Sequence, residues 1–216
     1  MDFCFGMGCN RSGQTSLLRI LNTHPSLSLL NEIYFTIDIQ KEKLSSEEAV
    51  SFFVNKYSES VKPATNILGG IGTLYYKDIF LLSQCFPQSK FLHVRRSLMG
   101  LVDAFIFDSH QNDYLGLISG DRYEWVVRLT KEIAEIVDKV ERAIHYVKSQ
   151  GHLVMAVDFE DMADDPYAVI ESISSFLEVD YDNFDLSIID DLYYNIMLNK
   201  WKKVPEIVRM KDENLI

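Results

Sequence analysis

Cysteine is scarce in this 216-residue chain, which contains only Cys4, Cys9 and Cys85. Three cysteines cannot all pair with one another, and their spacing matches no metal-ligand motif. This usage suits a reducing compartment. We interpret Cys4 and Cys85 as small buried apolar residues, and we expect no resident metal.

Long hydrophobic runs are also missing. No run of about 18 apolar residues occurs, so the sequence predicts no membrane-spanning helix. An apolar strand follows Met1 directly and leaves no room for a signal peptide. Hydrophobic residues make up 47% of the chain and charged residues 25%, which are ordinary values for a globular protein. We therefore expect a soluble, cytoplasmic protein with no membrane partner.

Basic residues are fewer than acidic ones. Lys and Arg number 21 against 32 Asp and Glu, and the net charge is −11. Such a surface repels nucleic acid and polyanionic glycans over most of its area. We expect no nucleic-acid partner, and any anionic ligand must be held by a local cluster of donors.

The most informative stretch is residues 3–21, FCFGMGCNRSGQTSLLRIL. A short apolar run stops at glycines, and apolar residues resume with helical spacing after Gly13. The pattern predicts a strand, a tight loop and a helix. The first N–H groups of such a helix have no backbone partner and carry the positive end of the helix dipole. The stretch therefore predicts an anion site, most often for phosphate, although an ordinary glycine-rich turn is the alternative.

The spacing from Gly8 to Gly13, followed by Gln14 and Thr15, is that of a Walker A loop with glutamine in place of lysine. Gln14 removes the point charge that P-loop NTPases place on the β- and γ-phosphates. Arg11 can supply a planar fork of donors instead. We expect an anionic ligand, but not ATP with magnesium.

The rest of the chain alternates between strand and helix patterns. A capping-box signature at 45–48 predicts a helix to about Tyr57. Further strands are predicted at 66–72, 90–96 and 152–158, and further helices at 75–86, 98–109, 123–150, 166–177 and 182–194. This alternation predicts one α/β domain over residues 1–216, a mostly parallel sheet flanked by helices on both faces. Ligands of such folds bind outside the carboxyl ends of the strands.

Three segments, in order, resemble the sulfotransferases that use 3′-phosphoadenosine 5′-phosphosulfate (PAPS). Residues 10–18 with His24-Pro25 are similar to the Arg-Ser-Gly-Thr-Thr loop and His-Pro helix end of that family. Residues 86–97 are similar to its second nucleotide strand, with Arg96-Ser97 in the places of Asn-Pro. Residues 158–177 are similar to its Tyr-Glu-Asp-Leu…Asp-Pro segment and Phe-Leu helix end. The resemblance spans about residues 3 to 182.

The resemblance implies a P-loop NTPase-like sulfotransferase fold, with PAPS as co-substrate and a small-molecule acceptor bearing a hydroxyl or an amine. It implies that Arg95 holds the 3′-phosphate and that Trp201 and Lys202 belong to a tail segment that closes over the nucleotide. Two catalytic candidates are Arg11, which would stabilise charge on the transferred group, and Glu32, which would be the base for the acceptor. The residues implied to hold the 5′-phosphosulfate are Arg11, Ser12, Gly13, Gln14, Thr15 and Ser16.

Three departures from the family pattern leave alternatives open. Gln14 stands where threonine is usual, Asp103 where serine is usual, and Gly72 where many members have lysine. They favour a non-catalytic, nucleotide-binding descendant as one alternative. Another is a degenerate P-loop kinase with Asp158 as its magnesium ligand, although Gln14 speaks against it. The sequence predicts neither the acceptor nor the oligomeric state.

The single site residues also have plainer interpretations. Glu32 fits a solvated loop carboxylate equally well, and Arg95 and Arg96 fit solvent-facing charges at a strand end. His93, in mid-strand, is interpreted as a hydrogen-bonded core residue. The acidic residues that follow the last strand are expected to act through caps and ion pairs rather than in catalysis; they are Asp158, Glu160 and Asp161.

Overall fold

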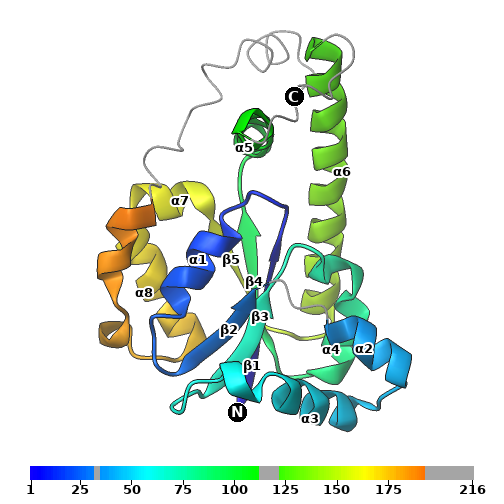
Figure 1. Ribbon diagram of the computed structural model, residues 1–216, viewed down its shortest axis with the longest axis vertical. Coiled ribbons are helices and arrows are strands. Elements are labelled where there is room, and N and C mark those ends of the chain that lie inside the picture. The colour runs from blue at the N-terminus through cyan, green and yellow to red at the C-terminus, as the bar shows by residue number, and fades with distance from the viewer. Residues whose placement is uncertain (32–34, 112–121, 193–216) are drawn as a thin grey trace.

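The computed structural model describes residues 1–31, 35–111 and 122–192, and its core is one parallel sheet (Figure 1). The strands lie in the order β2-β3-β1-β4-β5. All four pairings between neighbouring strands are parallel, so every strand ends at the same edge of the sheet. The strands are β1 (Asp2–Gly8), β2 (Leu27–Asn31), β3 (Ile67–Ile71), β4 (Lys90–Arg95) and β5 (Val154–Asp158). The α/β prediction is confirmed.

Helices cover both faces of this sheet, as Figure 1 shows. On one face lie α1 (Gln14–Leu21), α7 (Phe159–Asp164) and α8 (Pro166–Leu177). The other face is covered by α2 (Phe35–Glu42), α3 (Ser46–Lys56), α4 (Ile79–Cys85) and α6 (Arg122–Ser149). A further helix, α5 (Leu98–Gln111), lies beyond the carboxyl ends of the strands and packs on α6.

Two apolar layers hold the helices on the sheet. Leu17 and Ile20 of α1 pack with Leu92 of β4 on the first face. Phe5 of β1 and Phe53 of α3 pack together on the second face. The central strands are buried on both faces, which is why they read as nearly continuous apolar runs in the sequence.

Local signals set several of the predicted boundaries. The capping box at Ser45 forms with Glu48 and begins α3, which ends at Lys56. Helix α8 spans the predicted residues, because Asp165 accepts a hydrogen bond from the N–H of Ala168 and Pro166 occupies the first helical position. Two short helices, α2 and α7, were not predicted.

Two predicted helices were wrong in form. Residues 75–86 form a 3₁₀ turn (Tyr75–Lys77) and then α4, with a break at Asp78, whose carboxylate accepts a hydrogen bond from Thr36 Oγ1. In place of the helix predicted from Asp182, the described residues form two 3₁₀ helices, Tyr181–Asn183 and Leu186–Leu192.

Local side-chain bonds explain the second difference. The carboxylate of Asp180 accepts from the N–H of Asp182, and that of Asp185 accepts from both the N–H and the hydroxyl of Ser187. Such bonds compete with the helical backbone pattern. Within the described residues, no helix is long and apolar enough to cross a membrane.

Candidate functional site

The loop between β1 and α1 has the tight backbone that its glycines predict. Ser12 N–H donates to the Cys9 carbonyl at 3.2 Å, and Arg11 and Gly13 both have left-handed backbone, with φ of 71° and 96°. A Cβ atom on Gly8 would lie 2.2 Å from the carbonyl oxygen of Val94. Only glycine therefore allows the loop to lie so close to β4.

Two buried polar atoms converge inside this loop. Ser12 is 1% exposed and Gln14 is 8% exposed. The Oγ of Ser12 and the Nε2 of Gln14 have no hydrogen-bond partner among the described residues. A Cβ atom on Gly8 would lie 2.7 Å from the first and 2.8 Å from the second, so both atoms lie over the Gly8 Cα. An unmet buried polar group costs about 1–3 kcal/mol, and an anion bound here would satisfy both.

The N-terminus of α1 is open for the same ligand. Its N-cap residue, Gly13, supplies no side-chain hydrogen bond, and its first turn contains no acidic residue. The positive end of the helix dipole therefore faces the loop without an internal counter-charge in that turn. The helix begins with Gln14, and Thr15 and Ser16 follow in the same turn. The structure thus brings the predicted loop residues, 11 to 16, together at one helix end.

A pocket of about 340 Å³ lies next to this loop, at the carboxyl edge of the sheet. Cys9 and Ser12 line it from the loop, and Arg95 lines it from the end of β4. Burial raises the pKa of the Cys9 thiol to about 11, so this cysteine is protonated near neutral pH. The loop and Arg95, which the sequence assigns to one ligand, therefore border the same pocket.

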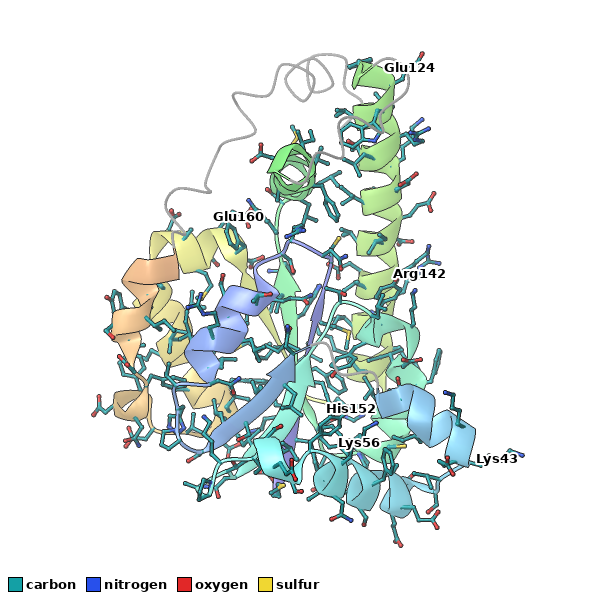
Figure 2. The ribbon with its side chains drawn as sticks, in the orientation of Figure 1. Lys43, Lys56, Glu124, Arg142, His152 and Glu160 are labelled. Carbon is teal, nitrogen blue, oxygen red and sulfur yellow. The ribbon has the colours of Figure 1, made fainter. Side chains whose placement is uncertain are left out.

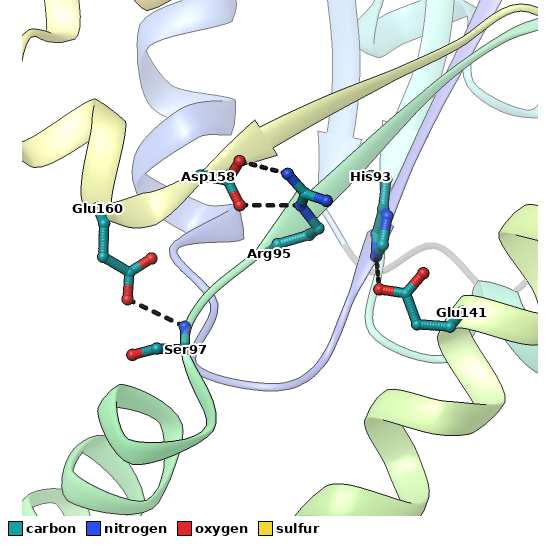
Figure 3. A network of polar contacts seen from close by, with 6 residues as sticks. All are labelled: His93, Arg95, Ser97, Glu141, Asp158 and Glu160. Carbon is teal, nitrogen blue, oxygen red and sulfur yellow. Dashed lines mark hydrogen bonds and ion pairs between the residues drawn. The ribbon is translucent and has the colours of Figure 1, made fainter.

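Arg95 forms a two-point ion pair with Asp158 across the ends of β4 and β5 (Figure 3). Its Nε donates to Oδ1 at 2.8 Å and its Nη2 to Oδ2 at 2.5 Å. The parallel register puts the two residues directly side by side. This contact raises the pKa of Arg95. It uses the Nε side of the guanidinium, and Nη1 has no partner among the described residues.

His93 lies on the same wall of the pocket, with its Nε2 3.7 Å from a carboxylate oxygen of Glu141 (Figure 3). It is buried, as predicted, but this distance is too long for the predicted hydrogen bond. Burial lowers the pKa of His93, and the charge of Glu141 only partly offsets that effect. The imidazole is therefore neutral at pH 7.

The sequence left Arg96 open between a solvent-facing charge and a functional residue. In the structure Arg96 is partly buried, borders the same pocket and contacts the loop between β1 and α1. Its Nη1 donates to the Arg11 carbonyl at 3.0 Å, and its guanidinium carbon lies 4.2 Å from the ring centroid of Phe159. Burial lowers the pKa of Arg96, while the carboxylates of Glu160 and Asp103 oppose that shift. No local pattern reveals these contacts, because they join segments that are distant in the sequence.

Two of the three acidic residues at the end of β5 and the start of α7 form the kind of polar contact that the sequence predicts. Asp158 pairs with Arg95, and the Oε1 of Glu160 accepts a hydrogen bond from the N–H of Ser97 at 3.0 Å, just before α5 (Figure 3). Ser97 Oγ in turn accepts from the N–H of Gly100. The start of α5, unlike that of α1, therefore already has an internal anion.

The three departures from the family pattern occupy different places. Gln14 is the first residue of α1. Asp103 is buried on α5, where its charge acts on Arg96, and it does not line the pocket. Gly72 follows β3, and a Cβ atom there would lie 3.3 Å from the ring of Tyr75.

Three predicted site residues, Glu32, Trp201 and Lys202, lie outside the described residues. Strand β2 ends at Asn31, so the residue before Glu32 is at the carboxyl edge of the sheet. In the part of the chain that the structure describes, no group of three His, Cys, Asp or Glu side chains is arranged to hold a metal ion.

Solved structures share this fold across nearly the whole chain. The sulfotransferase domain from the curacin biosynthetic pathway has a TM-score of 0.57 at 14% identity, covering 99% of this chain and 97% of that one. The sulfotransferase domain of the Synechococcus PCC 7002 olefin synthase has a TM-score of 0.58 at 18% sequence identity, covering 100% of this chain and 95% of that one. A sulfotransferase from Alicyclobacillus acidocaldarius has a TM-score of 0.59 at 16% sequence identity, covering 99% of this chain and 95% of that one.

Sequence comparison identifies the family. A search of curated proteins found no match. The family model described as "Sulfotransferase family" matches residues 43–183, which is more than half of the chain. The fold, with its parallel sheet and phosphate-type loop, agrees with that match. The chain therefore belongs to the sulfotransferase family.

Proposed function

We propose that this chain transfers a sulfuryl group from PAPS to a hydroxyl or amine of a small-molecule acceptor. The observation that carries the proposal is the convergence of two buried polar atoms, Ser12 Oγ and Gln14 Nε2, at the open N-terminus of α1; neither has a hydrogen-bond partner within residues 1–31, 35–111 and 122–192. A loop with this geometry is built for an anion. Because Gln14 is neutral, the loop suits a donor that does not rely on the P-loop lysine.

The arrangement of donors supports a nucleotide with phosphates at both ends of the ribose. The loop would bind the 5′-phosphosulfate through its N–H groups and hydroxyls, and Arg95 would offer Nη1 to the 3′-phosphate. The pocket between them, about 340 Å³, is within the range of small-molecule sites. Trp201 and Lys202 are proposed to close over the nucleotide.

Sulfuryl transfer requires positive groups where negative charge develops and a base at the acceptor. We assign the first task to Arg11 and to the N–H groups at the start of α1, which need no reorganisation during the reaction. We assign the second to Glu32, which follows the carboxyl end of β2. Holding donor and acceptor in line supplies the remaining part of the rate enhancement.

Two rival functions predict different ligands. A kinase would need Asp158 as a magnesium ligand, but both oxygens of Asp158 accept hydrogen bonds from Arg95. A non-catalytic descendant is favoured by the neutral Gln14 and by Asp103, and it would still bind the nucleotide. Ligand binding separates the kinase from the other two functions, and turnover separates those two.

The first test measures thermal stability with PAP, the desulfated product of PAPS, without magnesium. At about 100 times its dissociation constant, PAP should stabilise the fold by about 2.7 kcal/mol. For a domain of this size, that raises the melting temperature by about 2–4 °C per kcal/mol. A shift with ATP and magnesium, but none with PAP, would contradict the proposal.

The second test is a screen with PAPS and panels of phenols, alcohols and amines, in which the sulfated product is detected by mass. A protein that binds PAP but sulfates none of the panel would favour the non-catalytic descendant.

A further inference from the structure

The loop between β1 and α1, residues 9–13, which we call the phosphate loop, contains one residue whose backbone conformation is energetically costly. Arg11 and Gly13 both have left-handed backbone. Glycine adopts this conformation readily, but an arginine does so only at an energetic cost. The loop's own hydrogen bond from the Ser12 N–H to the Cys9 carbonyl offsets part of this cost, and contacts from outside the loop can offset more.

Arg96 supplies one of these contacts. It follows β4, at the strand end nearest the loop, and its Nη1 donates a hydrogen bond of 3.0 Å to the carbonyl oxygen of Arg11. The bond is charge-assisted, which makes it stronger than a bond between neutral groups. It fixes the peptide plane that follows Arg11, and so it opposes the return of Arg11 to ordinary backbone.

Phe159 supplies the other contact. It begins α7, next to Glu160, which Figure 2 labels beside the start of α1. Its ring packs on Gly13 so closely that a Cβ atom there would lie 2.5 Å from the ring carbon Cδ2. The guanidinium of Arg96 lies over the same ring, 4.2 Å from its centroid. Arg96 and Phe159, which we call the loop clamp, therefore contact each other and the two left-handed residues of the loop.

We propose that Arg96 is a positioning residue that, together with Phe159, holds the phosphate loop in its anion-binding shape before the ligand arrives. The identity of that ligand rests on the proposed function, but the loop clamp can be tested without any ligand. The clamp lets the loop present Ser12 Oγ and Gln14 Nε2 side by side. A ligand then binds without having to order the loop, which makes binding stronger.

Hydrogen exchange of the ligand-free protein tests the clamp directly. In Arg96→Ala and Phe159→Leu, the amides of residues 9–14 should exchange faster than in the wild type, by about tenfold, because a lost charge-assisted hydrogen bond permits more local opening. The amides of α8 should be unchanged. Arg142→Ala is the matched control, since this exposed arginine of α6 pairs with Asp138 on its own helix. Unchanged exchange of the loop in Arg96→Ala would overturn the proposal.

Gly100→Ala displaces the clamp without removing any charge. Gly100 lies in the first turn of α5, and a Cβ atom there would lie 2.8 Å from Arg96 Nε. Alanine favours a helix more than glycine does, and this gain offsets part of the cost of the close contact, so we expect the variant to fold. We nevertheless expect its loop amides to exchange faster. Wild-type exchange in a well-folded Gly100→Ala would count against the clamp, and this variant is informative even if Arg96→Ala does not fold.

Binding of AMP and PAP then connects the clamp with the ligand. Both nucleotides carry the 5′-phosphate, so Arg96→Ala should weaken both by the same factor, about tenfold. Arg96→Lys should recover most of this loss, because an ammonium group can also donate to the carbonyl and lie over the ring. Full affinity for AMP in Arg96→Ala would overturn the proposal. A wild-type protein that binds neither nucleotide would contradict the proposed function instead, and hydrogen exchange would still decide the clamp.

Discussion

Arg95 and Asp158 join the ends of β4 and β5 through two parallel hydrogen bonds, and this contact leaves Nη1 of the arginine facing away from its partner's carboxylate. A guanidinium can form one two-point contact along its Nε side and another contact at its far end. Asp158 thus fixes the orientation of Arg95 without using all of its donors. The proposed 3′-phosphate would accept a hydrogen bond from Nη1 of Arg95.

Arg95→Ala is expected to weaken PAP by roughly two orders of magnitude, because losing a charge-assisted contact costs a few kcal/mol. Adenosine 5′-phosphosulfate lacks the 3′-phosphate and should lose hardly any affinity. Calorimetric titration of both ligands measures the two effects. Arg142→Ala is the matched control for the loss of one positive charge. Equal losses for both ligands would mean that Arg95 acts on folding or on another part of the site.

Ser12→Ala should have opposite effects on stability and on binding. The Ser12 hydroxyl is buried and has no partner in the part of the chain that the structure describes, so its removal should stabilise the ligand-free protein by up to about 1 kcal/mol. The same change should weaken PAP, because the hydroxyl no longer contacts the phosphate. Denaturant unfolding and PAP titration measure the two effects separately.

Ser83→Ala provides the contrast for this prediction. Ser83 is also buried, but its hydroxyl is bonded to His152 Nε2 at 2.9 Å, so its removal should destabilise the protein. If Ser12→Ala destabilised the ligand-free protein as much as Ser83→Ala does, Ser12 Oγ would have a structural partner. The observation on which the proposed function rests would then be wrong.

Most of the fold could be predicted from the sequence, because its signals are local. Apolar runs mark the strands, and the loop after β1 shows its glycine spacing. Pro166, together with the cap at Asp165, marks the start of α8. These features depend on residues a few positions apart, so a single sequence contains them. The predicted loop residues accordingly lie together in the structure.

The contacts that complete the site could not be predicted in the same way. The Arg95–Asp158 pair depends on the register between β4 and β5, which are separated in the sequence by α5 and by the 28-residue helix α6. The contact between Arg96 and Phe159 has the same origin. Sequence reasoning chose between two adjacent arginines from a resemblance. The structure shows that both border the pocket, that Arg95 pairs with Asp158, and that Arg96 also donates to the Arg11 carbonyl.

Protonation of His24 should destabilise the fold. Its Nδ1 accepts from the N–H of Ser26 at 3.1 Å and its Nε2 donates to the Asp180 carbonyl at 3.0 Å, an arrangement that only the neutral ring allows. Burial lowers the pKa of His24. The unfolded state therefore binds the proton at a higher pH than the folded state does, and stability is lost as the pH falls below about 6.5.

Urea unfolding between pH 7.5 and 5.5 measures this dependence, with both values chosen to bracket the ordinary histidine pKa of about 6.5. His24→Gln should give a shallower loss of stability with falling pH than the wild type. Its slope should not vanish, because burial also lowers the pKa of His93. His145→Gln, at an exposed histidine of α6, is the control for the substitution itself. A wild-type slope in His24→Gln would show that this ring does not titrate as expected.

Glu32→Gln tests whether the chain is an enzyme. Strand β2 carries the chain to the carboxyl edge of the sheet, where the phosphate loop also lies, and Glu32 follows immediately. A general base contributes about 10²–10⁴-fold, because the proton must leave only as the acceptor attacks. Nucleotide binding does not require a base.

With an acceptor from the screen, turnover in Glu32→Gln should therefore fall by that factor while PAP affinity stays within about threefold. Glu47→Gln, at an exposed carboxylate of α3, should leave both unchanged. Normal turnover in Glu32→Gln would make Glu32 an ordinary loop carboxylate, and the base would then have to be sought among the other groups at this edge of the sheet.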